Sequence, residues 1–175
     1  MISSVITEYR RYKALGEGAI GQVQDADLTR AVDESNSIAV IVWHISGNLR
    51  SRFTDFRTAD GEKPWRNRDE EFLERVVPRA ELLAKWEAGW EALFGALAGL
   101  TDANLAQTVT IRGQSLSIAD ALIRSLAHTS YHVGQIVYLA KSFRGSDWRT
   151  LSIPKGGSAA YNLNPDREKT VNSRQ

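Results

Sequence analysis

Residues 117–143 read SIADALIRSLAHTSYHVGQIVYLAKSF, and this stretch decides the fold that we expect for the chain. Apolar residues recur in it at spacings of three and four, the pattern of a helix with one buried face. Ser117 is a good N-terminal cap, and Asp120 places a carboxylate in the first turn, where the helix dipole favours negative charge. We therefore expect a helix that begins at Ile118 and runs to Phe143.

The inner face of this helix carries His128 and His132, four residues apart. Side chains at this spacing lie about 5–6 Å apart on one side of a helix, so two imidazoles can bind one metal ion. The alternative is a pair of ordinary residues, one half-buried and one exposed. His44 is the remaining histidine, and it lies in a second amphipathic stretch, where an unpaired buried imidazole would be costly. The three histidines together predict a divalent metal site.

Ser125 and Gln135 lie on the same face, each three residues from one of the paired histidines. We regard both as candidates for hydrogen bonds to a ligand imidazole or to a substrate. For Ser125 an equal alternative is a hydroxyl bonded to its own helix backbone. Tyr131 projects to a different side, and we assign it to packing or an interface.

Three further helices are expected from apolar periodicity, capping residues and the position of Pro78. Between the third and fourth helices, Val109 and Ile111 alternate with polar residues before a turn at Gly113–Gln114, which predicts a β-hairpin. The expected fold class is all-α: a four-helix bundle with this small hairpin, over residues 1–150. The three helices span residues 4–24, Ser37 to Thr58, and 78–99.

Two other segments are irregular. The stretch GEKPWRNRDEEFLERVV at residues 61–77 predicts a loop with one helical turn. In it, Trp65, Arg66 and Arg68 form either the rim of a pocket or, as we favour, an exposed surface. Residues 151–175 form a C-terminal extension that we expect to pack partly on the bundle, with its last ten or so residues disordered.

Composition narrows the classes of function. The 175 residues carry a formal net charge of +1 and no cysteine, which excludes disulfides and thiolate ligands from this chain and argues against nucleic acid as a partner. The N-terminus has no apolar core of signal-peptide type, and no run approaches the roughly 18 apolar residues of a membrane span. We expect a cytoplasmic protein with a small-molecule substrate and no membrane partner.

The layout resembles the DinB/YfiT-like superfamily. The features that carry the resemblance are WHISGNL around His44, HTSYHVGQI with its paired histidines, the hairpin and SIADAL. The resemblance covers about residues 4–143 and implies a metal triad at His44, His128 and His132 in a homodimeric four-helix bundle. Its characterised members include thiol transferases that use bacillithiol or mycothiol, a mycothiol-dependent maleylpyruvate isomerase and metal-dependent hydrolases. The segment SIPKGGSAAYN is similar to an extension of one uncharacterised branch.

Three neutral imidazoles leave a divalent cation with its full charge and an open position. Zinc or nickel fits these ligands best, and iron also fits. Thr129 stands where the metalloprotease motif H-E-x-x-H has its glutamate, and no other carboxylate can be assigned to the site from the sequence. This favours thiol-dependent S-transferase chemistry on a small electrophile, with a low-molecular-weight thiol as cosubstrate. The alternatives are a metal-dependent hydrolase and a non-catalytic metal- or ligand-binding stress protein.

Overall fold

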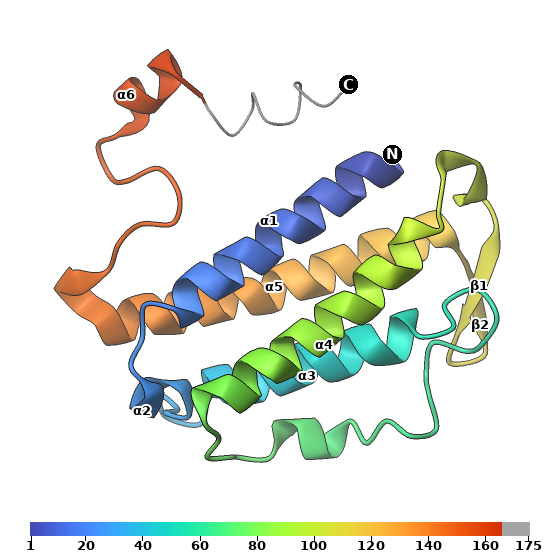
Figure 1. The fold of residues 1–175 in the computed structure, drawn as a ribbon, viewed down its shortest axis with the longest axis horizontal. Coiled ribbons are helices and arrows are strands. Elements are labelled where there is room, and N and C mark those ends of the chain that lie inside the picture. The colour runs from blue at the N-terminus through green and yellow to red at the C-terminus, as the bar shows by residue number, and fades with distance from the viewer. Residues whose placement is uncertain (166–175) are drawn as a thin grey trace.

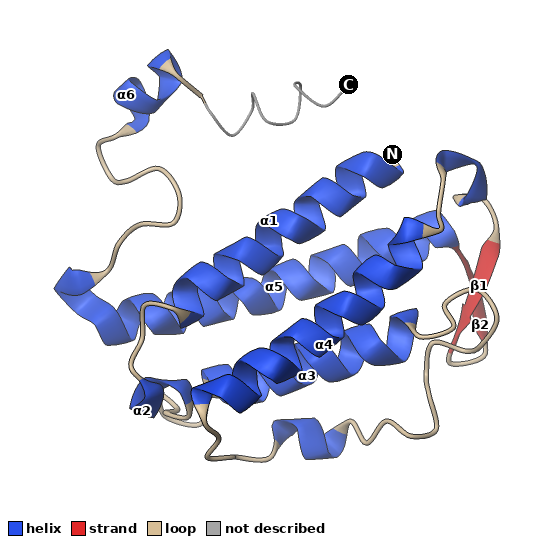
Figure 2. Cartoon of the chain, viewed as in Figure 1, coloured by secondary structure: helices blue, strands red, loops and turns tan. Residues whose placement is uncertain are grey.

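Four long helices form the body of the fold in the computed structural model, which describes residues 1–165 (Figure 1). The fold is mainly α-helical, as the sequence predicts, with one two-stranded antiparallel hairpin (Figure 2). The long helices are α1 (Ile2–Ile20), α3 (Ile38–Phe53), α4 (Arg79–Ala98) and α5 (Ile118–Arg144). The shorter elements are α2 (Asp25–Leu28), η1 (Asp69–Phe72), η2 (Asp102–Asn104), β1 (Thr108–Ile111), β2 (Gln114–Ser117), η3 (Gly145–Asp147) and α6 (Ser158–Leu163).

The predicted start of α5 is confirmed. The Ser117 hydroxyl accepts a hydrogen bond from the backbone N–H of Asp120 at 3.0 Å, and this cap satisfies one of the free donors of the first turn. The helix then continues without interruption to Arg144. It therefore presents both of its histidines on one rigid element.

Two helix ends differ from the prediction. The first helix ends at Ile20 rather than at residue 24, because Asp27 accepts a hydrogen bond from the backbone N–H of Gln24 at 3.2 Å and starts the separate helix α2. The second helix ends at Phe53 rather than Thr58. Thr54 is extended there, and Asp55 takes a positive φ of 50°, which a continuous α-helix does not allow.

The hairpin is present, with its turn one residue earlier than predicted. Thr108 pairs with Ser117 and Ile111 with Gln114. Arg112 and Gly113 both have positive φ, at 54° and 70°, as the tight turn between two such strands requires. Strand β2 leads directly into α5, so the hairpin closes one end of the long helices (Figure 2).

The long helices pack as two pairs around one apolar core. Helix α3 packs mainly on α4, α1 packs mainly on α5, and α3 also contacts α5. Tyr9, Trp86 and Trp90 are among the largest fully buried side chains, so the tryptophans of α4 serve packing, as the sequence indicates. None of the helices within residues 1–165 is both long and apolar enough to cross a membrane.

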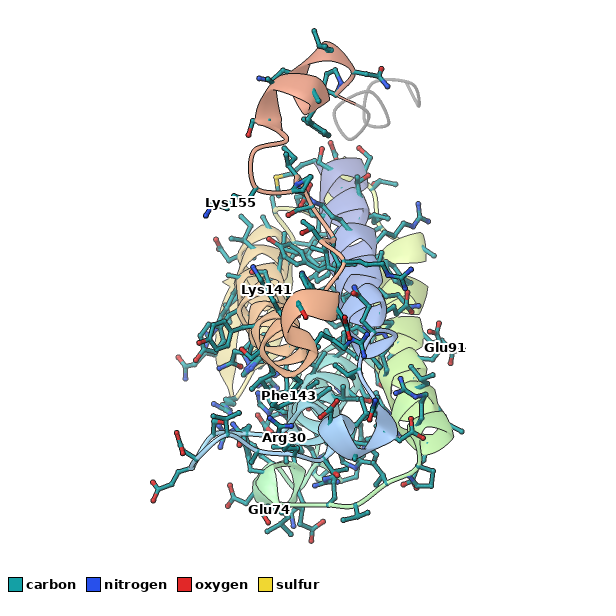
Figure 3. All side chains as sticks on the ribbon, turned by 90° about the vertical axis from the view of Figure 1, so that its left-hand side faces the viewer. Arg30, Glu74, Glu91, Lys141, Phe143 and Lys155 are labelled. Atoms are coloured by element: carbon teal, nitrogen blue, oxygen red, sulfur yellow. The ribbon has the colours of Figure 1, made fainter. Side chains whose placement is uncertain are left out.

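Beyond α5 the chain keeps some contact with the core and then leaves it. Arg30 stacks on the ring of Phe143 at 4.2 Å near the end of α5 (Figure 3), and Trp148 and Leu151 pack against the core. Helix α6 has no buried residue and lies away from the long helices (Figure 1). The disorder expected for the last ten residues falls outside the described part of the chain.

Candidate metal centre

The three histidines come from two helices that are distant in sequence. His44 lies on α3, which is capped by the Ser37 hydroxyl, and its side chain is buried at 4% exposure. Helix α5 supplies His128, which is half-buried, and His132, which is buried. The contact between α3 and α5 thus brings together the residues that the sequence singles out.

The geometry of the cluster suits a metal ion. One ring nitrogen of each histidine lies within 4.8 Å of those of the other two. The Nε2 atoms of His44 and His128 are 3.1 Å apart. Two nitrogens bound to one zinc ion at tetrahedral angles lie about 3.3 Å apart, so this spacing is close to what a shared cation needs. Three histidines could therefore hold a metal ion here.

Glu71 is the site residue that sequence reasoning missed. Its carboxylate accepts a hydrogen bond from Nδ1 of His44 at 2.9 Å, and the glutamate is 7% exposed. Because a carboxylate only accepts, Nδ1 carries the proton and Nε2 keeps its lone pair for the site. Such a pairing is typical of metal-ligating histidines. No local signal separates Glu71 from Asp69 and Glu70 beside it, since its burial depends on residues elsewhere in the chain.

Arg66 and Gly47 hold Glu71 in place. Arg66 donates from Nε to one carboxylate oxygen at 2.8 Å and from Nη2 to the other at 2.9 Å. A side chain at Gly47, on α3, would overlap the carboxylate, so only glycine admits it this close to the helix. Trp65 and Arg68 are exposed, but Arg68 also lines the cavity beside His44, so it forms part of the pocket rim that was the alternative. The prediction of an exposed surface is wrong for Arg66, whose side chain is 2% exposed because it pairs with a buried acid.

Gln135 orients the third histidine. Its side-chain oxygen accepts a hydrogen bond from Nδ1 of His132 at 2.7 Å, the contact that the sequence suggested. The amide nitrogen of Gln135 donates to the Tyr131 hydroxyl at 3.2 Å. Tyr131 is mostly exposed, but its ring lies 4.8 Å from that of His132, so it takes part in supporting the site as well as in surface contact. Because His44 and His132 carry their protons on Nδ1, the lone pairs of both Nε2 atoms are available to bind a metal ion.

Ser125 lies one turn before His128 on α5 and is buried. It lines the cavity beside the histidines, so its place on the predicted face is correct. Tyr9 of α1 lies next to it. Burial raises the pKa of the Tyr9 phenol, which the Ser125 hydroxyl opposes, so Tyr9 stays protonated in this interior.

The electrostatics keep the two imidazoles of α5 neutral. Burial lowers the pKa of His128 to about 4, and His132, His44 and two nearby arginines add to the shift. Burial also lowers the pKa of His132, against the effect of the hydrogen bond that His132 donates to Gln135. Burial would raise the pKa of Glu71, but Arg66 and His44 outweigh it and hold this pKa below its usual range. Neutral imidazoles and an ionised supporting carboxylate are the protonation states that a cation requires.

A cavity of about 220 Å³ lies beside the cluster. His44 and His128 form part of its wall, and Phe53, Phe56 and Ile111 supply apolar surface. The site therefore has room for a small guest next to the histidines. Five arginines complete much of the lining: Arg52, Arg66, Arg68, Arg112 and Arg124.

Comparison with known proteins places the chain in a family. Neither the curated proteins nor the solved structures provide a match. One family model matches residues 1–157, a range that contains the four long helices, the hairpin and the three histidines and ends just before α6. The resemblance to DinB/YfiT-like proteins stays a prediction. The chain belongs to the family DUF1572, described as protein of unknown function.

Proposed function

We propose that this protein is a metal-dependent enzyme of the DinB/YfiT-like type, with its four long helices forming a four-helix bundle. His44, His128 and His132 would hold zinc or nickel, with iron as a third choice. The observation that carries the proposal is the convergence of three imidazoles from two helices beside an open cavity. Such a donor set leaves room for a guest on the cation.

A divalent cation bound there supplies a Lewis acid that lowers the pKa of a thiol. The chain's own residues prepare the place for it. Glu71 and Gln135 fix the rings of His44 and His132 by their Nδ1 protons, and Arg66 keeps Glu71 ionised. Apolar residues of the cavity wall exclude water from one side of the guest.

The surroundings favour thiol transfer over hydrolysis. Both oxygens of Glu71 accept hydrogen bonds from Arg66 or His44, so this carboxylate is not free to act as a general base. The cavity lining contains no carboxylate among the described residues. We therefore propose S-transfer to a small electrophile that carries a leaving group. A low-molecular-weight thiol loses its proton to water, its sulfur forms a bond to the carbon of the electrophile, and the bond from that carbon to the leaving group breaks.

Metal analysis of the purified protein tests the site. One zinc or nickel ion per chain is expected in the wild type, and the metal should be lost in His128→Ala. Tyr138→Ala changes an exposed residue of the same helix and should keep the metal. Equal metal content in both variants would contradict the proposed ligands.

Activity assays separate the candidate reactions. Zinc-loaded protein is mixed with bacillithiol, mycothiol or glutathione and monochlorobimane as the electrophile. Thiol-dependent product that is lost in His128→Ala supports S-transfer. Turnover of ester or amide substrates in the absence of a thiol would instead show that the reaction is hydrolysis. Metal binding without either activity would support the alternative of a non-catalytic metal-binding protein.

Homodimerisation is also part of the proposal. Helix α5 exposes Ile123, Tyr131 and Tyr138, at 56%, 63% and 72%, and large apolar side chains of this kind are often covered by a second subunit. Sedimentation velocity should show a dimer, and replacement of Tyr138 by Lys should weaken it. A monomer at all concentrations would reject homodimerisation, but it would not affect the proposed metal site or reaction.

A further inference from the structure

The cavity beside the histidines has a strongly one-sided charge. Five arginines line it, and the lining contains no acidic residue within residues 1–165. They come from separate parts of the chain: α3, the loop before η1, the hairpin turn and α5. The fold, rather than a run of basic sequence, gathers this charge in one place.

Only part of this charge is neutralised by nearby carboxylates. Glu62 pairs with both Arg52, at 3.1 Å, and Arg112, at 2.8 Å. Glu71 is shared between Arg66 and His44. Three of the five guanidinium groups and one imidazole therefore share two carboxylates as their partners.

The remaining two arginines stand at the mouth of the cavity. Arg68 has one distant ion pair, with Asp69 at 3.8 Å, in which the Asp69 side chain is 98% exposed, and its guanidinium group also lies 4.9 Å from the centre of the Phe72 ring. Arg124 is exposed on α5 and has no ion-pair partner in the described part of the chain. Both side chains are therefore available to an anion that enters from solvent.

Arg66 adds an unsatisfied donor inside. Its side chain is 2% exposed, and Nε and Nη2 are used by Glu71. Nη1 is buried and has no hydrogen-bond partner among residues 1–165. A buried donor of a charged group is rarely left unpaired, so an acceptor from a bound molecule would complete it.

The size and the surroundings fit a small anion rather than a polymer. A volume of about 220 Å³ is below that of sites for drug-sized ligands, so it takes a small molecule or one end of a larger one. The whole chain has a formal charge of only +1, which argues against the broad basic face that nucleic acid would need. The apolar wall of Phe53, Phe56 and Ile111 suits the carbon part of such a molecule.

We propose that this cavity binds an oxyanion group, a carboxylate or a phosphate, of a small substrate or cosubstrate. Arg68 and Arg124 attract the anion at the mouth, and Arg66 donates to it inside. Guanidinium groups form paired, charge-assisted hydrogen bonds with both kinds of oxyanion. That the anion belongs to the molecule that reacts rests on the proposed function. The anion site itself requires no metal.

Calorimetric titration tests the proposal with succinate and with inorganic phosphate as probes, and with succinamide as the neutral match for succinate. Each titration is run on zinc-loaded and on chelator-treated protein. The variant is Arg68→Gln with Arg124→Gln, two exposed positions whose change leaves Glu71 paired. The control is Lys141→Gln, which removes one charge from the other end of α5 (Figure 3).

We expect a dianion to bind in both preparations and succinamide not to bind. The dissociation constant should rise about tenfold for each guanidinium removed and stay unchanged in Lys141→Gln. The tighter of the two probes identifies the oxyanion as a carboxylate or a phosphate. Failure of both probes to bind, or equal binding by the double variant, would overturn the proposal.

The two preparations separate the anion site from the metal site. Binding that needs zinc and ignores the arginines would mean that the anion sits on the cation, which rejects this inference and leaves the metal centre intact. Arginine-dependent binding in a protein that takes up no zinc when zinc is supplied would reject the metal centre and leave the anion site. Circular dichroism spectra of the variants confirm that each is folded.

Discussion

Glu71 is the residue on which the order of the metal centre depends most. It fixes the proton of His44 on Nδ1, and it is itself held by Arg66. Glu71→Gln keeps the shape but removes the charge that supports the imidazole. We expect the zinc affinity to fall roughly 10–100-fold, as is typical when the partner of a ligand histidine is changed. Competition with a chromogenic chelator measures the affinity.

The neighbouring Glu70→Gln is the matched control for this change. Glu70 is exposed and adjacent to Glu71, but its side chain has no hydrogen bond or ion pair with a histidine within residues 1–165, so zinc affinity should not change. An equal loss of affinity in both variants would mean that general charge, and not the bond to His44, supports the site.

His128 makes the stability of the metal-free protein depend on pH. Burial, with His132 and His44 nearby, lowers its pKa to about 4, whereas an unfolded histidine titrates near 6.5. Between these values the unfolded chain binds the additional proton, so the free energy of unfolding falls as the pH drops through this window. Thermal unfolding in the presence of EDTA, at several pH values between about 7 and 4, measures the effect.

His128→Gln is the comparison for this dependence. The variant lacks the titrating group, so its melting temperature should fall less steeply over the same range. Glu71 also loses its charge in acid and leaves a residual slope in both proteins, because its own pKa is lowered. Identical slopes in the two proteins would show that His128 is not the source.

Helix packing depends on a close approach between α3 and α4 at Gly89. A Cβ there would lie 2.8 Å from the Cα of Ser46, a backbone atom that cannot move without shifting the helix. We expect Gly89→Ala to destabilise the protein by roughly 1–3 kcal/mol, the usual cost of overpacking a core. Urea denaturation followed by tryptophan fluorescence gives the free energy of unfolding.

Gly95 offers a matched control on the same helix. A Cβ at Gly95 would meet nothing within 4 Å. Gly95→Ala should therefore stabilise the protein by up to about 1 kcal/mol, through helix propensity alone. If both substitutions changed stability in the same direction, the close approach of α3 and α4 would not be the cause.

The metal centre joins the two helix pairs of the whole molecule. His44 belongs to the pair of α3 with α4, and the other two histidines belong to the pair of α1 with α5. A cation bound only by the folded chain, at 100 times its dissociation constant, adds about 2.7 kcal/mol. For a chain of this size the melting temperature should rise by roughly 5–10 °C.

Scanning calorimetry with zinc and with chelator measures this rise. His44→Ala should abolish it, because two histidines on one helix cannot join the pairs. A zinc-dependent rise that persists in His44→Ala would show that the cation is held on α5 alone.

Much of the fold was predictable because its signals are local. Hydrogen bonds of a helix join residues four apart, so the apolar spacing, the Ser117 cap and Pro78 identify α4 and α5 closely. The predictions were wrong about where two helices end, at Ile20 and at Phe53. The apolar spacing of the sequence continues past both residues, but side-chain hydrogen bonds and backbone turns end the helices there. The hairpin was also predictable, since its two strands are adjacent in sequence.

By itself, the sequence determined the helices, the hairpin and the face of α5 that carries His128 and His132, because each depends on neighbours a few residues away. Only the tertiary structure decided that Glu71 and Arg66 are buried together against His44, and that five arginines surround one cavity. Apart from the Arg66–Glu71 pair itself, those contacts join segments tens of residues apart. The burial of an acid or an arginine depends on the partner that packing brings to it, and no local pattern records that partner.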